Sequence, residues 1–128
     1  MKLIDTMVLI VSINPKDKRN PKAMNHLDAV TQDADTFVPA PVLIEFELEL
    51  MSHGFNDDQR RTVLEDLSAV IPTTKVLPQS VISMLYALTL YRSGMTYFDS
   101  LIAGMAQESD ATVITADKAV TKVVKTEW

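Results

Sequence analysis

The chain has 128 residues, of which 47% are hydrophobic and 23% charged, with no cysteine and a formal net charge of −5 at pH 7. The length and composition fit one folded domain spanning residues 1–128. The lack of cysteine excludes a disulfide framework or a thiolate metal site. The negative net charge argues against a nonspecific nucleic-acid binder, which usually has a basic face. No apolar run reaches the roughly 18 residues of a membrane span, and Asp5 interrupts the apolar start where a signal peptide needs a continuous run, so we expect a cytoplasmic protein.

Taken in chain order, the apolar residues predict strands that alternate with helices. Asn20 and Pro21 suit the start of one helix, and Pro41 and Gly54 suit the start and the end of another. The expected elements are a strand at 2–5, a helix at 20–32, a strand at 36–39, helices at 41–54 and 56–71, a strand at 75–78, helices at 79–94 and 97–110, a strand at 111–117 and a short helix at 117–124.

Strands that alternate with helices indicate a parallel sheet, because parallel neighbours need crossover connections and these are usually helical. The predicted fold class is therefore α/β, a three-layer α/β/α sandwich with helices on both faces of the sheet. In such sheets, ligands bind beyond the carboxyl ends of the strands, where the strand order reverses. This rule indicates where functional polar residues are to be sought.

Two aspartates follow predicted strands. Asp5 ends the first strand and Asp117 follows the last, so a sheet that pairs these strands brings both carboxylates to one edge. Glu45 lies in the second turn of an apolar helix and Asp99 at the start of another, each flanked by core-type residues, and we place both acids at the same edge. Carboxylate oxygens in this arrangement suit a hard divalent cation, Mg²⁺ or Mn²⁺.

Each acid also has a structural interpretation that involves no metal. Asp99 fits a capping box with Thr96, and Asp117 fits the N-cap of the last helix. Asp5 could accept hydrogen bonds from a neighbouring loop, and Glu45 could lie on a solvent-facing stripe of its helix. Taken one at a time, the four residues leave both interpretations open.

The order and context of these acids resemble the PIN-domain nucleases, and among them the small toxin ribonucleases of the VapC type. The matching segments are LIDTMVL around Asp5, PAPVLIEFELEL around Glu45, YFDSLIAGMA around Asp99 and VITADKAV around Asp117. Together they span nearly the whole chain. The resemblance implies a PIN-like fold with four or five parallel strands, an acidic site for Mg²⁺ or Mn²⁺ and endonucleolytic cleavage of RNA. It also implies a homodimer and an antitoxin partner that inhibits the enzyme.

The resemblance also assigns roles to individual residues. It implies four catalytic and metal-binding acids with two supporting threonines, namely Asp5, Glu45, Asp99 and Asp117 with Thr6 and Thr115. Glu45 is expected to be either a ligand or the group that positions the attacking water. Crowded carboxylates repel one another, so a cation makes the ionised cluster favourable. The cation would lower the pKa of a water molecule and stabilise the charge that develops on the phosphate.

The chain departs from the family pattern at two places. Met7 stands where a small polar residue is common, so a polar support for the acids is missing. Ala119 and Val120 stand where many members have a further acid and a phenylalanine, which puts a fifth ligand in doubt. The alternative to a nuclease is therefore a catalytically inactive PIN-like module that binds RNA or protein.

An acidic site needs basic residues beside it to hold RNA, and such binding should weaken as salt rises. The candidate RNA-binding residues are Lys16, Lys18, Arg19, Lys22, Arg92 and Lys118. Lys118 is the best placed of them, because it directly follows Asp117. The net acidity of the chain predicts few phosphate contacts and modest affinity.

Two other α/β classes with acids at strand ends fit the sequence less well. A response-regulator receiver needs a pair of adjacent acids near the first strand, where this chain has Asp5 alone. A haloacid-type phosphatase needs the motif D-x-D after that strand, where this chain has D-T-M. The order of the four acids therefore favours the PIN-like interpretation over both classes.

Overall fold

The computed structural model describes all 128 residues, and its centre is a sheet of five parallel strands. The strands are β1 (Lys2–Ile4), β2 (Thr36–Pro39), β3 (Val76–Leu77), β4 (Thr112–Ile114) and β5 (Thr126–Glu127). Their order across the sheet is β3-β2-β1-β4-β5, so β1 is central and the order reverses between β1 and β4. The predicted parallel sheet is thus confirmed.

Strand β1 is the buried centre of the sheet. Leu3 lies opposite Phe37 of β2 on one side and Val113 of β4 on the other, and Ile4 lies opposite Ile114. Leu3 and Ile4 are fully buried. Strands covered on both faces are apolar throughout rather than alternating, which is why the short run before Asp5 reads as continuously apolar.

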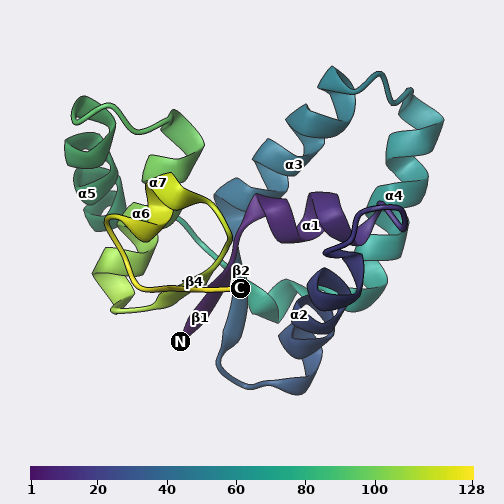
Figure 1. Cartoon of the computed structure of the whole chain (residues 1–128), viewed down its shortest axis with the longest axis horizontal. Helices are drawn as coiled ribbons and strands as arrows, with labels where there is room; N and C mark the ends of the chain where they lie inside the picture. The colour runs from purple at the N-terminus through teal and green to yellow at the C-terminus, as the bar shows by residue number, and fades with distance from the viewer.

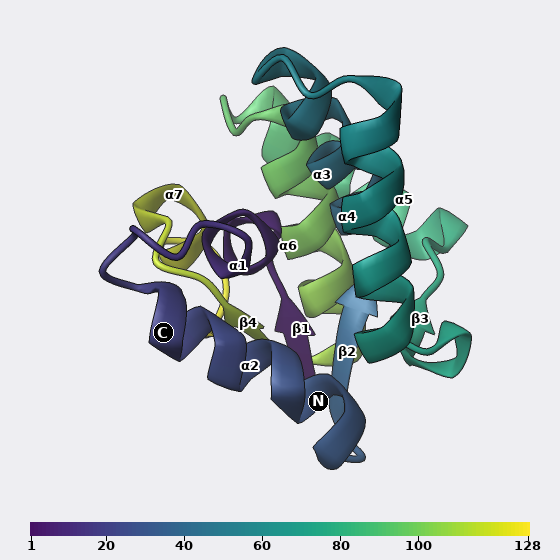
Figure 2. The ribbon, with the colours of Figure 1, turned by 90° about the vertical axis from the view of Figure 1, so that its right-hand side faces the viewer.

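Seven α-helices and one 3₁₀ turn surround the sheet. They are α1 (Thr6–Ser12), α2 (Asn20–Gln32), α3 (Ala40–Ser52), α4 (Asp57–Val70), the 3₁₀ turn (Thr73–Lys75), α5 (Val81–Arg92), α6 (Tyr97–Ser109) and α7 (Lys118–Thr121). Figure 1 shows α1, α2 and α4 on one side of the strands and α5 and α6 on the other, and in Figure 2 the strands lie between α2 and α6. This is the predicted three-layer α/β/α arrangement. None of these helices is both long and apolar enough to cross a bilayer.

Helix α1 was not among the expected elements. The run MVLIVS, which follows Thr6, forms this helix directly after β1, with Val8, Leu9 and Val11 buried. The run is apolar on almost every side, so it lacks the 3.6-residue period by which an amphipathic helix is recognised. The position of α1 matters for the site, because its first residue follows Asp5 immediately.

Smaller differences from the expected elements occur at helix and strand ends. Helix α2 has Arg19 rather than Asn20 as its N-cap residue. The Asn20 side chain instead donates to the carbonyl oxygens of Val11 and Ser12, each at 2.9 Å, and thereby fixes the end of α1 against the start of α2. The last helix ends at Thr121, and β5 is an additional strand of two residues, too short to produce a sequence pattern.

Helices α5 and α6 pack together unusually closely at Gly104. A Cβ atom at this position would lie 2.5 Å from the carbonyl oxygen of Ser83 and 2.9 Å from the backbone nitrogen of Ala87. Both of those residues are buried on α5. The absence of a side chain at Gly104 therefore sets the distance between the two helices.

Replacing Gly104 with alanine is expected to lower the free energy of unfolding by about 2 kcal/mol, because the added methyl group forces the two backbones apart. Urea denaturation measures the change. The control is Gln107→Ala, an exposed position on the same helix, which should alter stability by less than about 0.5 kcal/mol. Equal stability of Gly104→Ala and the wild type would contradict this packing.

Candidate active site

Asp5 lies at the junction of β1 and α1, where it is the N-cap residue of the helix. Asp5 is only 4% exposed. Thr115, the residue that follows β4, donates a hydrogen bond from its hydroxyl to Oδ2 of Asp5. The backbone nitrogen of Asp5 donates to the carbonyl oxygen of Ile114 at 3.2 Å. The side chain makes no N-cap hydrogen bond to α1, and the bond from Thr115 ties it to the segment that follows the neighbouring strand.

The environment of Asp5 disfavours its charged form. Burial raises the pKa of this carboxyl to about 6, the hydrogen bond from Thr115 opposes the rise, and the negative charges of Asp99 and Glu45 add to it. A carboxyl whose pKa is raised by burial and by nearby acids is typical of a functional site. The structure thus brings Asp5 within electrostatic range of two of the other predicted acids.

Glu45 approaches from α3, which begins directly after β2. The hydroxyl of Thr6, the first residue of α1, donates a hydrogen bond to Glu45 Oε2. Burial raises the pKa of Glu45, and the charges of Asp99 and Glu49 raise it further, whereas the bond from Thr6 lowers it. Glu45 is half-buried, so it is not simply part of a solvent-facing stripe.

Asp99 is the third residue of α6. Thr96 is the N-cap residue of this helix, but its side chain makes no capping bond. The hydroxyl of Thr96 instead donates to Asp99 Oδ2 at 2.6 Å, so the capping box that the sequence suggested does not form. Asp5 after β1, Glu45 on α3 and Asp99 on α6 therefore lie within electrostatic range of one another, and we call these three residues the acid cluster.

Asp117 is linked to the acid cluster only indirectly. Its backbone nitrogen donates to Thr115 Oγ1 at 3.0 Å, and this hydroxyl also binds Asp5. Its carboxylate accepts a hydrogen bond of 2.6 Å from the backbone nitrogen of Ala119 and caps α7. In this structure Asp117 has the helix-capping role that the sequence left open, and Thr115 connects its backbone to Asp5.

The chemistry of the acid cluster fits a divalent cation. Its donors are carboxylate oxygens, which Mg²⁺ and Mn²⁺ prefer, and a cation would relieve their mutual repulsion. The side chains are not assembled around a common point, since no three His, Cys, Asp or Glu side chains form a group able to hold a metal ion. The backbone nitrogen of Ala119 donates only to Oδ1 of Asp117, so Oδ2 stays available as a further donor to a cation.

The basic candidates lie at different places around the chain. Lys16, Lys18 and Arg19 belong to the exposed segment between α1 and α2. Lys118 is exposed at the start of α7, next to Asp117, and Arg92 is exposed in the last turn of α5. The structure adds one contact that no sequence pattern indicated. Arg19 Nη1 lies 3.6 Å from Sδ of Met7, in the first turn of α1.

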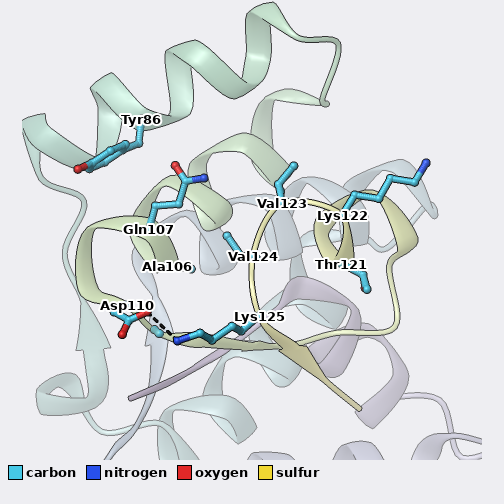
Figure 3. Close-up of a pocket in the computed structure, with 10 residues that line it drawn as sticks. Tyr86, Ala106, Gln107, Asp110, Thr121, Lys122, Val123, Val124 and Lys125 are labelled. Atoms are coloured by element: carbon cyan, nitrogen blue, oxygen red, sulfur yellow. Dashed lines mark hydrogen bonds and ion pairs between the residues drawn. The ribbon is translucent and has the colours of Figure 1, made fainter.

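A large hollow of about 630 Å³ lies away from the acid cluster (Figure 3). It is lined by the end of α6, including Ala106, Gln107 and Asp110, by Tyr86 of α5 and by residues 121–125. Asp110 follows the last residue of α6, roughly 16 Å further along the helix axis than Asp99. The hollow contains none of the predicted catalytic residues, and its Lys125 is paired with Asp110 at 2.9 Å.

Replacing Asp5 with asparagine is expected to stabilise the metal-free protein by about 3 kcal/mol at pH 8, because the variant buries no charge. The pKa of Asp5 is about 6 in the folded chain and about 3.8 in the unfolded chain, so the folded state takes up the proton first as pH falls. Stability of the wild type should therefore rise between about pH 7 and pH 4, and the advantage of the variant should disappear below pH 4.

Urea denaturation in chelator at pH 4, 6 and 8 measures this difference. Asp58→Asn, which removes an exposed acid in the first turn of α4, is the control for the change in net charge. Parallel stability profiles of Asp5→Asn and the wild type across this pH range would show that Asp5 is not a buried carboxylate with a raised pKa.

Comparison with known proteins agrees with the fold. The profile of the PIN domain family matches residues 2–125. VapBC2 from Rickettsia felis, solved with a DNA fragment from the promoter, is similar with a TM-score of 0.75 and 19% identity over 99% of this chain and 98% of that one. FitAcB from Neisseria gonorrhoeae has a TM-score of 0.74 and 20% identity over 98% and 96% of the two chains. DNA-bound VapBC from Salmonella typhimurium has a TM-score of 0.72 and 16% identity, with the same coverage. No curated protein sequence matches significantly.

Proposed function

Because the chain belongs to the PIN domain family, we propose that it is a metal-dependent endoribonuclease that hydrolyses RNA phosphodiester bonds as the cytoplasmic toxin of a type II toxin–antitoxin pair. The observation that supports the proposal is that Asp5, Glu45 and Asp99, from three separate segments, lie within electrostatic range of one another. Burial and neighbouring negative charge raise the pKa of both Asp5 and Glu45, which is the environment that a bound dication would make favourable.

In this proposal the four acids have different roles at the site of Mg²⁺ or Mn²⁺. Asp5, Asp99 and Asp117 hold the ion, directly or through water, and Glu45 is either a further ligand or the residue that positions the attacking water. When bound, the ion supplies Lewis-acid chemistry, which lowers the pKa of water and stabilises negative charge on the phosphate.

The threonines have supporting roles in the proposal. Thr115 donates to Asp5 and Thr6 donates to Glu45, so each hydroxyl restrains one carboxylate in its ionised form. A hydroxyl orients a carboxylate without adding positive charge. The site therefore remains negative and retains its attraction for a cation.

Asp99→Asn is expected to reduce Mn²⁺-dependent cleavage of labelled RNA by on the order of 100-fold or more, because an electrostatic group at the reacting centre is lost. In chelator the variant should melt at the wild-type temperature or slightly above it, because one repelling charge is gone. Asp58→Asn is the matched control, since it removes an exposed acid from the first turn of α4. It should leave cleavage unchanged.

The same experiment separates the proposal from its alternatives. An Asp99→Asn variant that melts early in chelator but still cuts RNA would give Asp99 a structural role only. A folded wild-type chain that binds RNA and cuts none of it with Mn²⁺ or Mg²⁺ would be the inactive PIN-like module. The departures at Met7 and Ala119 are the features that favour this second function.

The proposed partner is a cognate antitoxin. Two of the structures that share the fold are VapBC assemblies bound to DNA, and this likeness supports a similar assembly for the present chain. A small neighbouring gene that encodes a DNA-binding protein would identify the candidate. Copurification of its product with this chain, together with loss of RNA cleavage in the complex, would test the partnership.

We also propose that the chain forms a homodimer through α5. This helix carries seven of the exposed large apolar side chains, namely Val81, Ile82, Met84, Leu85, Tyr86, Leu88 and Tyr91. Its only charged residue is Arg92, at the end of the helix. Two copies of a chain with a net charge of −5 can therefore meet at this face without bringing like charges together.

Leu85→Glu is expected to convert the dimer to a monomer at micromolar concentration, because the symmetric contact would bury two opposed carboxylates. Sedimentation velocity measures the change. Leu64→Glu places the same charge at an exposed apolar position on α4 and should leave the dimer intact. A wild-type chain that sediments as a monomer, or equal effects of the two variants, would contradict the proposed interface.

A further inference from the structure

The segment between α1 and α2 brings the positively charged side chain of Arg19 into contact with the first turn of α1. Arg19 precedes α2, and its Nη1 lies 3.6 Å from Sδ of Met7, twelve residues earlier. Met7 is the second residue of α1, two residues after Asp5 and next to Thr6, whose hydroxyl binds Glu45. Because α1 begins directly after Asp5, the contact lies at the end of α1 that is next to Asp5 in the chain.

The guanidinium of Arg19 is held in one orientation. Nε donates to Asp17 Oδ1 at 3.1 Å and Nη2 donates to Asp17 Oδ2 at 2.8 Å. Asp17 Oδ1 also accepts from the backbone nitrogen of Arg19 at 2.8 Å, which fixes the turn that carries both residues. These hydrogen bonds from Arg19 lower the pKa of Asp17 to about 2, so the pair is fully ionised at neutral pH.

The same arrangement leaves part of the guanidinium without a strong acceptor. Asp17 occupies the edge formed by Nε and Nη2, and Nη1 faces the thioether of Met7, which accepts hydrogen bonds only weakly. The Arg19 side chain is 45% exposed, so a ligand can reach it. Lys16 and Lys18 in the same segment make no ion pair that would orient them.

We infer that Arg19 binds an RNA phosphate next to the proposed cleavage site, and that Met7 is the positioning residue that holds Nη1 at the start of α1, where Asp5 is the N-cap residue. The inference rests on the proposed nuclease function. The acid cluster repels the RNA backbone, and an oriented guanidinium at the start of α1 supplies the charge-assisted hydrogen bond that offsets this repulsion. A carboxylate or amide at position 7 would satisfy Nη1 and compete with the phosphate, whereas the methionine packs against it without competing.

The first test is binding of a fluorescein-labelled single-stranded RNA, followed by anisotropy in chelator at several salt concentrations. Arg19→Gln is expected to raise Kd roughly tenfold, the effect of one charge-assisted hydrogen bond. It should also reduce the slope of log K against log salt by about 0.7, the value for one phosphate contact with a single strand. Arg61→Gln, an exposed arginine on α4, is the control and should change neither quantity.

The second test concerns Met7. Met7→Ala should raise Kd roughly threefold in the wild-type background and have no effect in the Arg19→Gln background, because a positioning residue acts only through the group it positions. Met7→Leu keeps most of the volume and should lie closer to the wild type. Equal effects of Met7→Ala in both backgrounds would overturn the positioning role. Thermal melting of each variant separates this result from a loss of stability.

The outcomes distinguish the inference from the proposed function. If the wild type cuts RNA and Arg19→Gln behaves like Arg61→Gln, the nuclease proposal stands and the role of Arg19 is wrong. If Arg19→Gln lowers the salt slope but no variant cuts RNA with Mn²⁺, Arg19 binds RNA and the nuclease proposal is wrong. A wild-type chain that neither binds nor cuts RNA overturns both. In an active enzyme, Arg19→Gln should raise KM more than it lowers kcat.

Discussion

The burial of the Asp5 carboxylate between the ends of β1 and β4 is the constraint on which the site depends. Strand order makes it possible, because β4 is the direct neighbour of β1 and carries Thr115 at the end that Asp5 reaches. The unfavourable burial of this charge is offset by the fully buried apolar residues around it, including Leu3 and Ile4. Removal of the charge is therefore expected to change the stability of the fold and, in the proposed nuclease, the activity of the site.

The acid cluster is organised by hydroxyl groups rather than by cations. Each of its three carboxylates accepts a hydrogen bond from a different threonine hydroxyl, in the pairs Thr115 with Asp5, Thr6 with Glu45 and Thr96 with Asp99. A lysine or arginine in these places would neutralise the cluster and remove the negative charge that the proposed dication requires. The positive charge of Arg19 stays outside this group, paired with Asp17.

The parts of the molecule that depend on apolar runs and strand order were predictable from the sequence. These include the parallel sheet and the approach of the Asp5 strand to the strand before Asp117, because buried strands and crossover helices leave clear patterns. Helix α1 was missed because its residues are apolar all round. The choice between the two interpretations of Asp117 and the contact between Met7 and Arg19 were not predictable. They depend on side-chain conformation and on the structure of a loop, and neither of these produces a periodic pattern in the sequence.

The outermost strands of the sheet, β3 and β5, contain only two residues each. An edge this short exposes few unpaired backbone groups, so it is a poor template for strand addition by another molecule. The proposed dimer therefore uses a side-chain surface, the exposed apolar residues of α5, rather than a sheet edge. A protein made in large amounts can in this way associate through a helix while avoiding the cross-β aggregation to which open sheet edges are prone.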